Sequence, residues 1–174
     1  MPVPRLHPQN RVVFRLVSTY EWLLSIHITG AFMFLGGGAA AGILNYRAWR
    51  AERPSEVAQL LRLISRIAVP VLGIGSVVAL VFGIWLVHKA GASFGAFWIW
   101  AAIILWAVAG ALGGRSGRHQ QRTLAEATRL EQSGDTMTPE LRALVRDPVG
   151  NALAYGSGLT IVLILILMIW KPGH

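Results

Sequence analysis

The 174-residue sequence has no cysteine and few charged residues, which make up 14% of it. A chain without cysteine has no disulfide, no thiolate metal site and no cysteine nucleophile. Soluble domains carry roughly 25% charged residues, so this proportion argues against a soluble globular domain. Acidic residues are scarcer still, with eight Asp and Glu against sixteen Lys and Arg. These absences favour a chain whose surface is largely apolar, as contact with lipid requires.

Long stretches without any charge are what the sequence has in abundance. Four apolar blocks, at about 22–46, 67–87, 97–114 and 152–170, contain no Asp, Glu, Lys or Arg. As a helix rising 1.5 Å per residue, the first block is roughly 37 Å long, enough to cross a hydrocarbon layer of ~30 Å. We therefore predict an all-α integral membrane protein, an up-down bundle of four transmembrane helices.

A signal peptide is the alternative for the first block, since arginines precede it and Ala39-Ala40-Ala41 resembles a cleavage site. The block is longer than the apolar part of a signal peptide, and an arginine-rich stretch, 47–53, follows it. A retained helix is therefore expected. The chain then divides into a basic N-terminal arm, residues 1–19, and a four-helix transmembrane domain, residues 20–174.

The segments between the blocks carry signals for shorter helices and for breaks. Pro54 suits the first turn of a helix, and Thr138-Pro139 indicates an N-cap followed by proline. Residues 115–132 form a polar stretch with helical spacing. Asp147-Pro148 should end the helix that begins after Thr138. Pro70 lies inside the second block, where it should bend that helix. The chain between the third and fourth spans is thus predicted to be a helical loop.

The formal charge of +8 comes from basic residues that lie mostly on one side of the predicted bundle. Residues 47–66 and 115–151 hold eleven of the sixteen Lys and Arg. Cytoplasmic loops carry such an excess, which predicts an inner (cytoplasmic) membrane protein with both termini outside and a cytoplasmic helical loop. The opposing argument is that seven of the eight acids share that side, leaving a net charge of +4 on each. Because loop position explains the positive charge, we expect the lipid bilayer and no nucleic acid as a partner.

His27 is the polar residue within the spans that is best suited to chemistry. It lies about five residues inside the first block, and Gly30 and Ala31 occupy the next turn of the same face. Small residues there leave room for a flat macrocycle, with Phe34 at its lower edge. Histidine is an axial ligand of haem iron, and a second ligand would come from His88, near the end of the second block.

The alternative for His27 is a hydrogen bond across a helix interface, where polar side chains hold membrane helices together. Its candidate partners in other spans are Ser76, Ser157 and Thr160, and a backbone carbonyl freed by a helix irregularity is a fourth possibility. No acid lies at the depth of the histidine, so no Ser/His/Asp set is predicted. No two histidines are spaced for a shared metal, so we expect neither a catalytic centre nor a metal site.

Two pairs of glycines follow the small-xxx-small spacing that lets membrane helices approach closely. Gly38 and Gly42 form one pair in the first block, and Gly110 and Gly114 form the other in the third. This spacing predicts helix packing, either inside this bundle or against a helix of another membrane protein.

Several runs of residues resemble a known family. The runs are LLSIHITGAFMFLGGG, LVFGIWLVHKAG, WIWAAIILW and LMIWKPG, and together they cover about residues 20–172. They resemble a bacterial family described as predicted integral membrane proteins of unknown function. The first run is also similar to copper-resistance D proteins, which implies copper handling, and to haem-binding membrane protoporphyrinogen oxidases, which implies a haem ligand at His27. The chain lacks the intramembrane basic residue that the oxidases use for porphyrin carboxylates, and it has no Met-rich or His-rich copper cluster.

These observations predict a small polytopic membrane protein without its own catalytic centre. It would serve as a structural or accessory subunit that packs against another membrane protein or complex. The alternative is a membrane protein that binds haem b, with His27 as axial ligand, for electron transfer or porphyrin chemistry. A third possibility, passive transport of a small solute or metal, rests on the glycine-rich faces alone.

Overall fold

The computed structural model describes residues 19–89 and 95–170, and within them every long element is a helix. In chain order these are α1 (Thr19–Arg50), α2 (Pro54–Leu63), the π-helical segment η2 (Ile64–Ala68), α3 (Val69–Lys89), α4 (Phe97–Gln132), α5 (Pro139–Val145) and α6 (Pro148–Trp170). Four stretches are long and apolar enough to cross a membrane: Thr19–Arg50, Pro54–Lys89, Phe97–Gln132 and Pro139–Trp170. The predicted all-α class and the four spans are confirmed. The basic arm lies outside the described residues except for Thr19.

The helices extend beyond the apolar blocks that predicted them. The largest extension is in α4, where the polar stretch 115–132 continues the third block as one helix of 36 residues. At 1.5 Å per residue this helix is about 54 Å long, so it exceeds a ~30 Å hydrocarbon layer by roughly 20 Å. The predicted helical loop is therefore built largely from the protruding end of a membrane helix.

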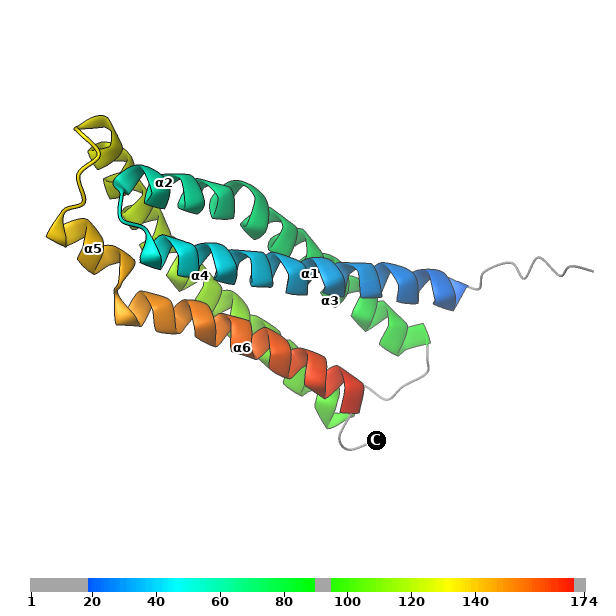
Figure 1. Ribbon diagram of the computed structural model, residues 1–174. Helices are drawn as coiled ribbons and strands as arrows, with labels where there is room; N and C mark the ends of the chain where they lie inside the picture. Colours follow the sequence, from blue (N-terminus) through cyan, green and yellow to red (C-terminus); the bar gives the residue numbers. More distant parts are fainter. Residues whose placement is uncertain (1–18, 90–94, 171–174) are drawn as a thin grey trace, which may run out of the picture.

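The four spans form two helix pairs, α1 with α3 and α4 with α6 (Figure 1). The pairs are joined at one end, where α2 packs against both α1 and the polar half of α4. We call this the closed end, and the opposite end, where α1 and α4 begin and α3 and α6 end, the open end. The up-down arrangement is as predicted, but the contacts between the pairs are concentrated at the closed end.

The closed end has a core like that of a soluble protein. Its fully buried side chains come from α2, η2, α4 and α5: Val57, Ala58, Ile64, Ala127 and Leu141. A polar bridge adds to it, since Asn45 of α1 donates a hydrogen bond to Asn151 of α6 and accepts one from Gln120 of α4. The rest of the molecule exposes large apolar side chains, with Phe32 72% exposed, which suits a surface that contacts lipid.

The pair formed by α1 and α3 is held by backbone contact through glycine. A Cβ atom added to Gly75 of α3 would lie 2.5 Å from the backbone nitrogen of Phe34. Cβ atoms added to Gly30 and Gly37 of α1 would each lie 2.7 Å from a backbone nitrogen of α3. Only glycine allows helices to approach this closely, so these three positions fix how α1 and α3 pack.

The predicted helix signals are observed with one refinement. Pro54 begins α2, and Thr138 caps α5 by accepting a hydrogen bond from the backbone N–H of Leu141. The helix break before α6 is also observed, and the Asp147 carboxylate accepts a 2.7 Å bond from the Gly150 N–H. The irregularity near Pro70 is a π-helical turn over Ile64–Ala68, in which the Val69 N–H bonds to the carbonyl five residues back.

Candidate functional site

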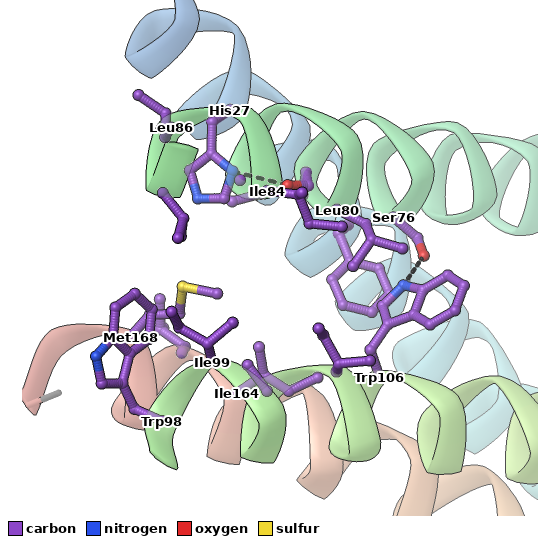
Figure 2. Close-up of a pocket in the computed structure, with 18 of the residues that line it drawn as sticks. His27, Ser76, Leu80, Ile84, Leu86, Trp98, Ile99, Trp106, Ile164 and Met168 are labelled. Carbon is purple, nitrogen blue, oxygen red and sulfur yellow. Dashed lines mark hydrogen bonds between the residues drawn. The ribbon is translucent and has the colours of Figure 1, made fainter. Parts of the chain in front are cut away.

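A cavity of about 860 Å³ lies between the two helix pairs at the open end (Figure 2). Its walls come from all four spans and are mainly aliphatic and aromatic. The described residues that line it include no Asp, Glu, Lys or Arg. The polar side chains among them are His27, Ser76, Tyr20 and two tryptophans. Ligand sites in proteins typically combine such an apolar cavity with a few placed polar groups.

His27 extends from α1 into this cavity and is anchored to α3 (Figure 2). Its Nδ1 atom lies 2.8 Å from the backbone carbonyl oxygen of Ala79. Because a carbonyl only accepts hydrogen bonds, Nδ1 must carry the proton and donate it. In the neutral tautomer with this bond Nε2 carries no proton, and no described residue forms a hydrogen bond with it. The imidazole therefore presents an acceptor to an apolar space.

Gly83 of α3 makes room for the ring. A Cβ atom there would lie 3.0 Å from Cε1 and 3.1 Å from Nδ1 of His27. Any larger residue would push the imidazole away from the Ala79 carbonyl. Gly83 is a site residue that sequence reasoning missed, because it lies 56 positions after His27 in a helix with several glycines.

The space predicted beneath His27 is only partly present. Ala31 and Phe34 line the cavity, as the macrocycle hypothesis requires. Gly30 does not, because it is buried against α3, where an added Cβ would lie 2.8 Å from a side-chain carbon of Val78. The prediction that Gly30 leaves room for a ligand is therefore wrong, since the α3 backbone fills that room.

His88, the predicted second ligand, is not brought to His27. It lies in the last turn of α3, is exposed, and is absent from the residues that line the cavity. The wall facing His27 comes from α6, where Ile161, Ile164, Leu165 and Met168 share one helical face. Figure 2 shows the Met168 side chain across the cavity from the imidazole.

The hydroxyl groups considered as partners of His27 are engaged elsewhere. Ser76 accepts a 2.7 Å hydrogen bond from the indole N–H of Trp106, which links α3 to α4 at the deeper end of the cavity (Figure 2). Ser157 donates to the Ala109 carbonyl at 3.1 Å, and Thr160 donates within its own helix at 2.8 Å. His27 bonds to none of these hydroxyls but to the Ala79 carbonyl, which lies within the regular helix α3 and not at a helix irregularity.

The predicted packing glycines do not hold the bundle together. Cβ atoms added to Gly42, Gly110 and Gly114 would meet no described atom within 4 Å. One added to Gly38 would make only ordinary contacts, at 3.4 Å with Ile161 and 3.7 Å with Leu72. Gly42, Gly110 and Gly114 therefore do not mediate helix packing within the described part of the chain. Their contact with a helix of another membrane protein stays a prediction.

A smaller cavity of about 20 Å³ lies at the closed end, beside the asparagine bridge. His119 lines this cavity, and its Nε2 atom lies 3.0 Å from the Leu144 carbonyl oxygen and 3.8 Å from the Asp147 carboxylate. The volume accommodates about one water molecule. Within residues 19–89 and 95–170, no group of three His, Cys, Asp or Glu is placed to hold a metal ion.

Comparison with known proteins gives a family match over nearly the whole chain. The model of a family described as "Predicted integral membrane protein (DUF2269)" matches residues 21–172. No curated protein and no solved structure matches the chain. The matched range includes all four spans except the first two residues of α1.

Proposed function

We infer that the chain, which belongs to the DUF2269 family of predicted integral membrane proteins, acts within the bilayer. We propose that it binds haem b there. The proposal places the haem in the open-end cavity with His27 Nε2 as the axial ligand. The observation that carries it is the bond from Nδ1 to the Ala79 carbonyl, which leaves Nε2 as a base directed into an apolar space. A haem held this way supplies one-electron chemistry.

The surroundings of His27 resemble those of metal-binding histidines in general. Such histidines usually donate their second ring N–H to a backbone carbonyl or carboxylate, which fixes the tautomer and the ring orientation. Here Ala79 accepts that bond, and Gly83 provides the space for the ring. Both groups belong to α3, which contacts α1 through backbone, so the imidazole is held by the most tightly packed helix pair.

The cavity suits a large, flat and mostly apolar group with polar carboxylates at one edge. Its volume of about 860 Å³ is within the range of cofactor sites, and its walls are apolar. The carboxylates would lie toward the open end, where Tyr20 lines the cavity and Lys89 ends α3 exposed. The four apolar blocks contain no Lys or Arg, so an arrangement with the carboxylates at the membrane edge is the one the charges of the chain support.

The test is the absorption spectrum of the detergent-purified protein, oxidised and dithionite-reduced, after expression with haem supply. We expect a Soret band and a reduced α-band in the wild type and their loss in His27→Gly. Added imidazole should restore haem to His27→Gly, because a free ligand can fill the vacated space. His88→Ala is the matched control and should retain haem. A folded wild type that remains colourless after incubation with hemin would overturn the proposal.

A role as an accessory subunit is the second candidate, and the unused glycines favour it. Gly110 and Gly114 share a face of α4 that meets no other described part of the chain, although their spacing suits a close helix contact. Under this proposal a helix of another membrane protein covers that face. Gly110→Leu should then leave the isolated chain folded and reduce its assembly with that partner, whereas unchanged assembly would exclude this face.

A further inference from the structure

Met168 lies in the cavity wall that faces His27. It belongs to α6, is half-buried, and is the only sulfur-containing residue among the described residues that line the cavity. Its helical face is defined by Ile161, Ile164 and Leu165, which precede it at steps of seven, four and three and also line the cavity. The thioether therefore points to the same space as the imidazole, as Figure 2 shows.

We propose that the Met168 thioether is the second axial ligand of the haem, an inference that rests on the proposed function. Two axial ligands must approach the iron from opposite faces of the macrocycle. His27 comes from the α1/α3 pair and Met168 from the α4/α6 pair, and the cavity separates the two. The bound group would thus join the helix pairs at the end where they make few contacts with each other.

Ligation by histidine and methionine determines the class of reaction. With His27 and Met168 both holding the iron, no position would remain for oxygen or a substrate. A thioether ligand raises the reduction potential of haem, and the walls without charged side chains disfavour the additional positive charge of the ferric state. The site would accept and return single electrons at a comparatively high potential and would catalyse no reaction of its own.

The alternatives for the second position are less well supported by the geometry. His88 is exposed and does not line the cavity. Ser76 is turned toward Trp106, to which it is hydrogen-bonded. Tyr20 lies in the first turn of α1, on the same helix as His27, and so does not approach from the opposite wall.

The experiment compares the haem spectra of the full-length protein and of three variants. The wild type should be low-spin, show the weak near-infrared band of ferric haem with a thioether ligand, and bind no carbon monoxide when reduced. Met168→Leu should keep the Soret band through His27 but lose the near-infrared band, become high-spin and bind carbon monoxide. Met168→His should return to low spin at a lower reduction potential. Met33→Leu, which does not line the cavity, is the control and should match the wild type.

The outcomes separate this inference from the proposed function. A wild type that holds haem with the same spectrum as Met168→Leu would overturn the assignment of Met168 and leave His27 as ligand. A wild type that holds no haem would overturn both. Loss of all haem from Met168→Leu while Met168→His retains it would support ligation by this position, since only a ligating side chain restores binding.

Discussion

At the scale of single residues, Asp135 connects the loop after α4 to the beginning of α2. Its backbone is left-handed, with φ 54°, and its carboxylate accepts 2.7 Å hydrogen bonds from both the N–H and the hydroxyl of Ser55. Ser55 lies in the first turn of α2, where helix N–H groups lack partners and a negative charge is favourable. The Ser55 hydroxyl, then its N–H, and to a smaller extent the charge of Arg53 lower the pKa of Asp135.

Asp135→Asn should therefore destabilise the closed end and change how stability depends on pH. A carboxyl whose pKa is lower in the folded state contributes stability above its unfolded value of about 3.9, and this contribution disappears as pH falls through the folded value. The wild type should lose part of its thermal stability below about pH 4, and the variant should lack that part. Thermal unfolding in detergent between acidic and neutral pH measures this, with Glu140→Gln, an exposed carboxylate, as control. Parallel pH profiles for wild type and Asp135→Asn would contradict it.

The candidate site was partly predictable at this scale. His27 stands out because it is the only ionisable side chain well inside an apolar block. Met168 does not, since it is separated from His27 by 141 positions and an isolated methionine in a membrane helix carries no local signal. His88 lies nearer the edge of the bundle than His27, so its role as a second ligand requires a tilted or displaced second helix. Depth follows from position along a helix, but the direction of a side chain depends on how the helix is rotated against its neighbours.

At the scale of helices, the glycines show what spacing does and does not determine. The α1 sequence has small residues on several faces, so several small-xxx-small pairs are available to a neighbour. The structure uses Gly30 and Gly37, together with Gly75 of α3, and leaves Gly42 without a described neighbour. Sequence spacing identifies helices that are able to approach closely, whereas the face that is used depends on the shape of the partner.

Gly75→Ala should disrupt the α1/α3 pair. Its Cβ would lie 2.5 Å from the Phe34 nitrogen and 2.7 Å from the Gly30 carbonyl oxygen, and these backbone atoms cannot rotate away as a side chain does. We expect a loss of about 3 kcal/mol or more, seen as a lower melting temperature or aggregation in detergent. Gly42→Ala is the matched control and should melt like the wild type, because no described atom lies within 4 Å of the added carbon. Equal melting of the two variants would show that α1 and α3 pack differently.

At the scale of the whole molecule, hydropathy determined the number of spans, and the pairing of helices could not be deduced from it. Apolar blocks report that a helix contacts lipid or another helix, without distinguishing the two. The closed-end core could not be predicted from the sequence either, because α2 and α5 are short and the residues that they bury come from segments far apart in the chain. The two helix pairs are thus held together mainly by the closed end, beyond the apolar blocks, and the cavity lies between them at the open end.

The orientation of this shape in the membrane is the remaining prediction at this scale. The closed end is formed by 47–66 and 115–151, which hold eleven of the sixteen basic residues. Basic residues set orientation with little contribution from acids, so we expect the closed end in the cytoplasm and both termini and the open-end cavity outside. Because the chain has no cysteine, single cysteines report on this directly. Thr19 and Ser133 are both exposed, at the open and closed ends.

In intact cells, a membrane-impermeant thiol reagent should label Thr19→Cys and leave Ser133→Cys unlabelled. After permeabilisation both variants should be labelled, which shows that protection comes from the membrane and not from the fold. The opposite pattern in intact cells would reverse the orientation while leaving the four spans in place, and it would put the cavity with His27 near the cytoplasmic surface. Labelling of both positions without permeabilisation would place both ends outside, which requires an even number of membrane crossings between Thr19 and Ser133. Since the four-span bundle has three spans between these positions, that result would contradict it and would mean that one of the three does not cross.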